Sequence, residues 1–163
     1  MKHLLDSNTF IEAKNRYYGM KICPAYWEWL LLQNNALEIA SISLVFDELK
    51  RGNDELSNWV KDNSKLFLDV SDDATQQAFG AVAQMLADQA PKMKAGAFED
   101  FLSGADPWLI AKAMTSGATI VTHEVHNRDM KKKFSIPNVC EELGIPFMNT
   151  FELLHKLEAC FIL

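Results

Sequence analysis

Short apolar runs, each bounded by polar or turn-forming residues, recur along the chain and predict buried β-strands. The runs read KHLLD, LEIAS, LFLDV, ATIVTHE and PFMN, at residues 2–6, 37–41, 66–70, 118–124 and 146–149. Segments with helical periodicity separate them. Such an alternation of strands and helices is typical of α/β proteins with a mainly parallel sheet.

The helical segments carry recognisable start and stop signals. Pro24 stands near the start of the first, Ser43 is the cap candidate of the second, and Thr150 is expected to cap the last. Aspartates open the longest segment, where they suit the positive end of the helix dipole. The expected helices lie at residues 22–35, 43–53, 54–63, 72–90, 98–102, 106–117, 136–144 and 150–157.

Size and charge narrow the classes of function. The chain has 163 residues, of which 48% are hydrophobic and 23% charged. No linker or repeat divides it, so we expect a single domain over residues 1–163. The net charge of −6 gives no overall attraction to nucleic acid or to an anionic membrane. A polyanionic partner would therefore need local basic patches or bound cations.

Cysteine usage and hydropathy indicate the compartment. Cys23, Cys140 and Cys160 are far apart in the sequence and form neither a zinc knuckle nor a redox dithiol, which predicts reduced thiols. No apolar stretch approaches the roughly 18 residues of a membrane span. The apolar run near the first residue is too short for a signal peptide. We therefore expect a cytoplasmic protein with no membrane partner.

Acidic residues end two of the predicted strands. Asp6 follows the first strand and Glu124 follows the fourth. In open parallel sheets, binding sites form beyond the carboxyl ends of the strands. If these two strands pair, their carboxylates become neighbours.

Two predicted helices each direct one acid towards the core. At about 100° per residue, Glu48 falls within the apolar face of residues 43–53, whereas its neighbour Asp47 does not. Asp106 begins the apolar i, i+3, i+4, i+7 stripe of residues 106–117. Helix geometry therefore adds two inward-facing carboxylates to those at the strand ends.

Each acid also has an ordinary structural interpretation. Asp6 can end its strand in an Asx-type turn. Asp106 before Pro107 has the pattern of an N-cap followed by proline at the first helical position. Glu48 can bend towards solvent, and Glu124 can be a loop residue. Four clustered carboxylates, however, are costly without cations or protons, and oxygen-only ligands suit Mg²⁺ or Mn²⁺.

The ordered motifs LLDSN, SLVFDELKRG, GADPWLIAKA and TIVTHE resemble those of the PIN-domain ribonucleases, and the likeness runs from Lys2 to about Leu154. The chain looks closest to a bacterial branch of PIN-like proteins. The resemblance implies a three-layer α/β/α sandwich around a mainly parallel sheet of four or five strands. It also implies a hydrolase: a metal-dependent endoribonuclease that cleaves single-stranded RNA and leaves a 5′-phosphate.

Carried onto this sequence, the resemblance implies a set of catalytic and metal-binding residues: Asp6, Glu48, Asp106 and Glu124. Asn8 and Thr122 match the small polar positions beside the first and last acids. Aspartate is more usual at the position of Glu124, and the extra methylene of glutamate can shift or weaken a second metal position, so a site with one Mg²⁺ or Mn²⁺ is compatible with this chain. His123 has two interpretations: a residue that contacts phosphate or transfers a proton, or a polar residue at the rim.

Basic and aromatic residues near these motifs are candidates for RNA binding. Arg128 and Lys131 follow the last acid in the run NRDMKKKF, although most lysines in such runs belong to solvated loops. Arg16 and Tyr17, in KNRYYG, can contact a phosphate and stack on a base. The alternative is a helix end with its tyrosines packed on the surface.

The sequence also suggests protein partners and leaves two alternative functions open. Many PIN-like proteins are toxins held by an antitoxin, and many dimerise, so the resemblance implies an antitoxin protein or a second copy as partner. Core packing explains most of the aromatic run AYWEWLLL, and the alternative is that a partly exposed Trp27 or Trp29 seats this partner. A PIN-like binding or scaffolding module without turnover stays open, and Glu124 favours it. A phosphatase that uses Asp6 as nucleophile is the third alternative. It is disfavoured because Asn8 stands where such enzymes usually have a second acid.

Overall fold

Five parallel strands form the centre of the molecule. The computed structural model describes residues 1–162. The strands are β1 (His3–Leu5), β2 (Ile39–Ile42), β3 (Phe67–Leu68), β4 (Thr119–Val121) and β5 (Phe147–Met148). They lie in the order β3-β2-β1-β4-β5 and every pairing is parallel. The prediction of a mainly parallel sheet of four or five strands is confirmed.

The strand order changes direction at the centre of the sheet. From β1 the chain moves outwards through β2 to β3, and it then returns to the other side of β1 with β4. Leu5 pairs with Val121 in this central register. In open α/β sheets such a switch point leaves a crevice beyond the strand ends. The residues that follow Leu5 and Val121 therefore enter the same crevice.

Helices connect the strands, most of them close to the predicted ranges. The helix α1 (Ser7–Asn15), directly after β1, is an addition to those predictions. It buries Thr9, Phe10 and Ala13. The other α-helices are α2 (Pro24–Asn35), α3 (Ser43–Lys50), α4 (Glu55–Asp62), α5 (Asp73–Gln89), α6 (Ala97–Leu102), α7 (Asp106–Ser116), α8 (Ile136–Leu143) and α9 (Thr150–Lys156).

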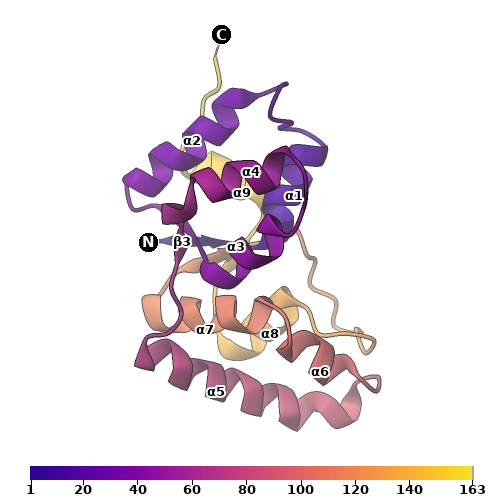
Figure 1. Cartoon of the computed structure of the whole chain (residues 1–163). Helices are drawn as coiled ribbons and strands as arrows, with labels where there is room; N and C mark the ends of the chain where they lie inside the picture. Colours follow the sequence, from indigo (N-terminus) through magenta and orange to yellow (C-terminus); the bar gives the residue numbers. More distant parts are fainter. Residues whose placement is uncertain (163) are drawn as a thin grey trace.

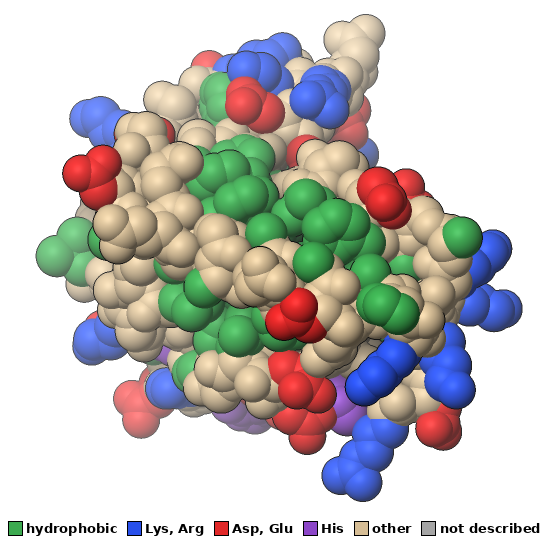
Figure 2. Space-filling view, turned by 90° about the horizontal axis from the view of Figure 1, so that it is seen from below, with side chains coloured by type: hydrophobic (Ala, Val, Ile, Leu, Met, Phe, Trp, Pro, Cys, Tyr) green, Lys and Arg blue, Asp and Glu red, His purple; other side chains and the backbone are tan. Residues whose placement is uncertain are grey.

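The helices cover both faces of the sheet and make a layered α/β/α sandwich. Figure 1 shows α1, α2, α4 and α9 on one side of the strands and α7 and α8 on the other, with α5 packed outside α7. Phe79 of α5 and Trp108 of α7 stack with ring centroids 3.8 Å apart. Figure 2 shows the face seen from below, where hydrophobic side chains spread across the middle and lysine and arginine side chains gather at one edge.

The core is continuous, and its aromatic side chains are well covered. Tyr26, Trp27 and Trp29 of α2 are all buried, with Trp29 9% exposed. The prediction that core packing explains these aromatics is therefore confirmed, and the alternative, in which a partly exposed Trp27 or Trp29 seats a partner, is wrong. Among the helices described, none is both long enough and apolar enough to cross a membrane.

Two helix caps differ from the sequence prediction. Asn149, and not Thr150, caps α9: its side chain accepts a hydrogen bond from the Glu152 N–H, and Glu152 accepts one from the Asn149 N–H. This reciprocal pair is a capping box. Ser43 is the first residue of α3, and Ile42 occupies the cap position without a side-chain hydrogen bond. The chain passes from β2 into α3 with no intervening turn, which leaves no residue free to act as a cap.

Candidate active site

Asp6 lies at the end of β1 and is almost fully buried, with 3% of its surface exposed. It occupies the cap position of α1, yet its side chain makes no capping hydrogen bond. Thr9 instead bonds to the backbone carbonyl of Asp6 through both its N–H, at 3.1 Å, and its hydroxyl, at 2.7 Å. The Asp6 carboxylate is thereby left to face the crevice beyond the strand ends.

Thr122, directly after β4, fixes that carboxylate. Its hydroxyl donates to Asp6 Oδ2 at 2.9 Å and accepts from the Glu124 N–H at 3.1 Å. The pairing of β1 with β4 brings these residues together although 116 positions separate them in the sequence. Burial raises the pKa of Asp6 to about 6, the Thr122 hydrogen bond lowers it, and the charge of Glu124 raises it further.

Glu48 reaches the same region from α3. Its Oε1 accepts a hydrogen bond from the Ala105 N–H at 3.2 Å, immediately before α7 begins. Asp47 points elsewhere and pairs with Lys50 at 2.6 Å on the outside of the helix. Glu48 therefore faces inward and Asp47 outward, as the helical geometry predicts.

Asp106 is the first residue of α7, and Ala105 occupies the cap position without a side-chain hydrogen bond. The interpretation of Asp106 as an N-cap followed by proline at the first helical position is therefore wrong. Its carboxyl instead shares the crevice with the other acids. Burial and then the charges of Asp6, Glu124 and Glu48 raise the pKa of Asp106 to about 8, and Lys133 lowers it.

Glu124 completes the group from the loop after β4. Its Oε2 accepts the Ile136 N–H at 2.8 Å, so the carboxylate lies at the start of α8. A negative charge is favourable at the positive end of a helix. Glu48 and Glu124 thus each hold the start of a helix with a carboxylate oxygen, and both raise the pKa of Asp106 through their charge.

The donor set of this site suits a hard cation. All four side chains offer carboxylate oxygens, the ligands that Mg²⁺ and Mn²⁺ prefer. Their mutual repulsion is the kind of interaction that a bound cation relieves. Within residues 1–162, however, no three His, Cys, Asp or Glu side chains already stand together as a ready-made metal site. The acids therefore fit such a metal by chemistry, and side-chain rotation would have to bring their oxygens around it.

Asn8 and His123 join α1 to the loop after β4. Asn8 Oδ1 accepts the His123 N–H at 3.2 Å, and His123 Nε2 lies 2.9 Å from the Thr150 hydroxyl. Burial lowers the pKa of His123, which favours its neutral form. These contacts place both residues beside Thr122 and outside the carboxylate group.

The predicted RNA-binding residues fall into two separate cavities beside the acids. Arg16 and Tyr17 line one of about 380 Å³ together with His123 and Phe151. Arg128 and Lys131 are among the residues that line the other, of about 440 Å³. None of the four acids lines either cavity. The loop after β4 links the two, because it carries His123 on one side and Arg128 on the other.

Comparison with known proteins supports the fold. The family model described as a domain of unknown function, DUF4411, matches residues 3–161. No curated protein matches the sequence. The structure of VapBC2 from Rickettsia felis, bound to a DNA fragment from its promoter, contains a chain similar over 91% of this chain and 98% of its own, at 18% identity and a TM-score of 0.56. VapBC-1 from nontypeable Haemophilus influenzae is similar over the same shares, at 12% identity and a TM-score of 0.54. The predicted PIN-like fold is confirmed.

The raised pKa of Asp106 makes stability depend on pH. In the unfolded chain its pKa returns to near 3.8. Between that pH and about 8 the folded state keeps a proton that the unfolded chain has lost, so the free energy of unfolding falls as pH rises. We expect Asp106→Asn to be more stable than the wild type at pH about 9, by more than about 2 kcal/mol, and equally stable near pH 4. Urea unfolding across this range measures the difference.

The matched control for this substitution is Asp47→Asn, which removes an exposed carboxylate from the outside of α3. We expect it to change the unfolding free energy by less than about 1 kcal/mol. An Asp106→Asn effect that stays constant with pH would show that the carboxyl is not held among the other acids.

Proposed function

We propose that this chain, which belongs to the DUF4411 family, is a metal-dependent endoribonuclease that hydrolyses phosphodiester bonds of single-stranded RNA. The observation that carries the proposal is the convergence of four carboxylates at the switch point of a PIN-like sheet, where each contributes to a raised pKa. Such a cluster is costly as a purely structural feature. It is useful where a cation has to be held beside a polyanion.

Asp6, Glu48, Asp106 and Glu124 would hold Mg²⁺ or Mn²⁺ through carboxylate oxygens. When bound, such a metal lowers the pKa of a coordinated water and polarises the phosphoryl oxygen. Thr122 positions Asp6 by donating to its Oδ2 at 2.9 Å. The backbone N–H groups of Ala105 and Ile136 hold one oxygen of each glutamate. Hydrogen bonds thus hold one oxygen of each of these three acids, and the side chains would still have to rotate to surround a bound metal.

RNA binding would use the two cavities that flank the acids. Around the smaller one, Tyr17 is 64% exposed and its ring meets that of Phe151 edge-on, with centroids 5.6 Å apart. Arg16 lies beside them and pairs with Glu12 at 2.7 Å. Exposed aromatic rings next to a guanidinium provide a surface on which an unpaired base can stack.

A toxin role follows from the same proposal. The two similar structures are of VapBC-type proteins, and we infer from them that this chain is the toxin of a toxin–antitoxin pair. Its partner would be an antitoxin protein, and a homodimer is the second assembly that we propose. Ile22, Leu32 and Val125 expose between 63% and 80% of their surface, so apolar area is available for such contacts.

Cleavage of an unstructured RNA tests the activity directly. We expect the wild type to cleave it only with Mg²⁺ or Mn²⁺ and to leave a 5′-phosphate. Asp6→Asn and Asp106→Asn each remove a carboxylate ligand and should lower the rate at least about 100-fold. Gel analysis of a 5′-labelled strand measures the rate. Asp47→Asn serves as the matched control and should cleave like the wild type, and equal rates in all variants would reject the assignment.

Metal binding should depend on pH in the direction set by the raised pKa values. Asp6 and Asp106 hold protons up to about pH 6 and 8 respectively, and a metal has to displace them. We expect Mn²⁺ to bind more tightly at pH 8 than at pH 6 and to release protons as it binds. Calorimetry in two buffers with different ionisation enthalpies measures both quantities.

A second candidate function is the PIN-like binding or scaffolding module. The lack of a ready-made three-ligand metal site in residues 1–162 favours it. The calorimetric experiment separates the two functions. Mn²⁺ binding in the millimolar range or tighter, lost in Asp106→Asn, supports the nuclease, and its absence in the wild type supports the scaffold.

Substitutions at Tyr17 test the stacking surface. Tyr17→Ala removes the exposed ring and should weaken the affinity for a single-stranded RNA by at least about fivefold, because stacking contributes roughly 1–3 kcal/mol per base. Tyr17→Phe keeps the ring and should bind like the wild type. Fluorescence anisotropy measures both affinities, and a loss in Tyr17→Phe equal to that in Tyr17→Ala would argue against stacking.

A further inference from the structure

The cavity of about 440 Å³ is bordered by a loop that is attached at two points. On one side, the Asn138 side chain of α8 accepts the Asn127 N–H at 3.1 Å and donates to the Asn127 carbonyl at 2.8 Å. On the other, the Lys131 carbonyl accepts the Lys94 N–H at 2.7 Å, from the segment after α5. The opening between α5, α8 and this loop is therefore defined by backbone attachments as well as by side chains.

Positive charge is concentrated around this cavity. Its cationic side chains are Lys92, Arg128, Lys131 and Lys133. In the part of the chain that the structure describes, none of the four pairs with a carboxylate within 4.0 Å. Glu141 and Glu142 also line the cavity, and Glu141 pairs with His126. Four cations against two acids leave an excess of positive charge in a chain whose net charge is −6.

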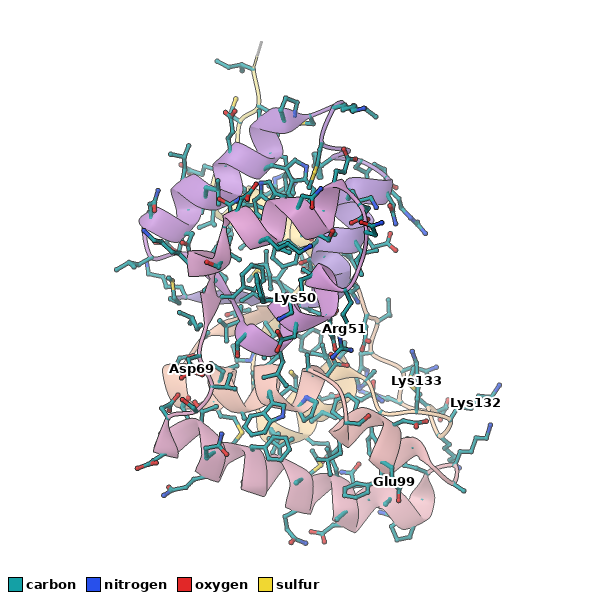
Figure 3. The ribbon with its side chains drawn as sticks, in the orientation of Figure 1. Lys50, Arg51, Asp69, Glu99, Lys132 and Lys133 are labelled. Atoms are coloured by element: carbon teal, nitrogen blue, oxygen red, sulfur yellow. The ribbon has the colours of Figure 1, made fainter. Side chains whose placement is uncertain are left out.

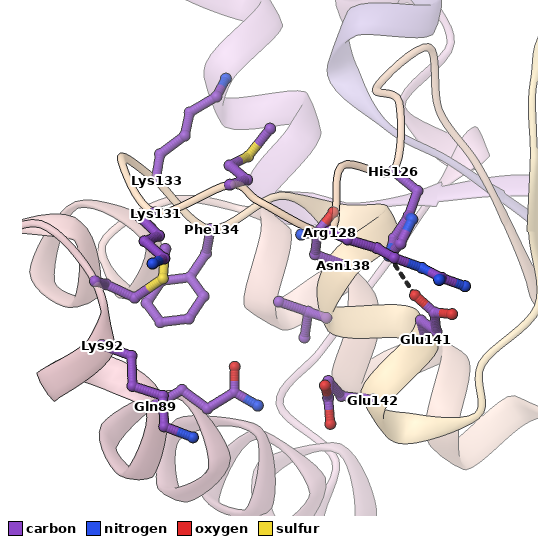
Figure 4. A pocket seen from close by; sticks show the side chains of 13 residues that line it. Gln89, Lys92, His126, Arg128, Lys131, Lys133, Phe134, Asn138, Glu141 and Glu142 are labelled. Atoms are coloured by element: carbon purple, nitrogen blue, oxygen red, sulfur yellow. Dashed lines mark ion pairs between the residues drawn. The ribbon is translucent and has the colours of Figure 1, made fainter.

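The cations surround the opening from different elements. Figure 4 shows Lys92 on the segment after α5, Lys131 beside Phe134 on the loop, and Arg128 near the His126–Glu141 pair, with Lys133 turned outward at the edge. Figure 3 places Lys132 and Lys133 on the side of the molecule where α6 lies. Lys132 does not line the cavity, although it stands between two residues that do.

The interior of the cavity adds apolar surface to this charge. Met93, Met130, Phe134 and Val139 line it, and Phe134 packs against Phe101 with ring centroids 5.9 Å apart. A volume of about 440 Å³ lies within the range of small-ligand sites. A charged rim with an apolar interior matches a nucleotide, which carries an anionic phosphate and a flat base.

The cavity also adjoins the carboxylate site. Lys133, at its edge, is near enough to Asp106 for its charge to lower the pKa of that carboxyl. Glu124 binds the N–H of Ile136, two residues after Phe134. A strand whose phosphate lies at the carboxylates can therefore place a neighbouring nucleotide in the cavity.

We propose that this cavity binds one nucleotide of the RNA strand next to the cleaved bond. Arg128, Lys131 and Lys92 hold its phosphate, and its base lies against Met93 and Met130. The assignment of the ligand to an RNA strand rests on the proposed ribonuclease function. The cavity supplies positive charge that the carboxylate site itself lacks, and so it sets the position of the strand relative to the acids.

Methyl-group NMR of the methionines tests this assignment without relying on cleavage. The protein carries ¹³C-methyl methionine and the substitution Asp106→Asn, so that the RNA stays intact in Mg²⁺. We expect a single-stranded RNA oligonucleotide to shift the methyl signals of Met93 and Met130 and to leave that of Met114, which is 38% exposed on α7, unchanged. AMP and inorganic phosphate, added separately, serve as the free-ligand probes.

Lys131→Ala and its neighbour Lys132→Ala form the matched pair. We expect Lys131→Ala and Arg128→Ala each to lower the RNA affinity, measured from the methyl shifts, about tenfold. Each should also reduce the salt dependence of binding by about one phosphate contact. Lys132→Ala should change affinity less than about twofold. Equal losses in Lys131→Ala and Lys132→Ala would overturn the proposal, since a diffuse basic loop would then account for the binding.

The remaining outcomes separate this inference from the ribonuclease itself. Methyl signals that do not move while the wild type cleaves RNA overturn the cavity assignment alone. Methyl signals that move while the wild type cleaves nothing overturn the proposed function alone. AMP that binds as tightly as the oligonucleotide overturns the assignment to a strand, because a free nucleotide would then suffice.

Discussion

The parallel pairing of β1 with β4 places negative charges where they would otherwise avoid one another. Leu5 and Val121 are register partners, so the residues that follow them leave the sheet side by side. One is Asp6, and the other begins the turn that carries Glu124. The Thr122 hydroxyl bridges the Asp6 carboxylate and the Glu124 N–H, which fixes the first acid in a buried position. Helices α3 and α7 then bring Glu48 and Asp106 to the same crevice, so the electrostatics of the site follow from one strand pairing.

This repulsion has to be compensated within the fold. Two of the acids obtain partial compensation from backbone donors, since Glu48 binds the Ala105 N–H and Glu124 binds the Ile136 N–H. Both donors lie at the start of a helix, where the dipole favours negative charge. Asp106 has to rely on protonation or on a cation, and burial together with the three neighbouring charges raises its pKa to about 8. This unrelieved repulsion is the physical reason for proposing that the site holds a divalent cation.

Local patterns in the sequence were sufficient for the strands and for the direction of the acids on α3. Apolar runs located all five strands, and helical spacing separated Glu48 from Asp47, because both signals depend on residues close together in the chain. Features that depend on tertiary contacts could not be predicted from such local patterns. Asp106 has the sequence pattern of a cap, yet it is the first helical residue, and Ala105 before it donates its N–H to Glu48 of α3.

Among the residues around the site, too, those defined by tertiary contacts were hard to predict from the sequence. Thr122 and Asn8 could be suggested only by likeness to a family, and their partners, Asp6 and the His123 N–H, lie more than a hundred residues away. Lys92 had no signal at all, since it joins Arg128 and Lys131 only through the fold of the segment after α5.

Distribution of charge, more than its total, decides what this surface can bind. The net charge of −6 acts on a polyanion only within about a Debye length, roughly 8–10 Å in physiological salt, because salt screens exposed charges that are farther apart. At contact distance, local charge dominates, and the loop after β4 carries most of the relevant cations. This loop leaves the carboxylates at Glu124 and reaches Lys131, where its carbonyl binds the Lys94 N–H. One short segment thus connects an anionic crevice with a cationic cavity. Such a juxtaposition fits the proposed ligand, a strand that is anionic along its length and would meet a bound cation only at the carboxylates.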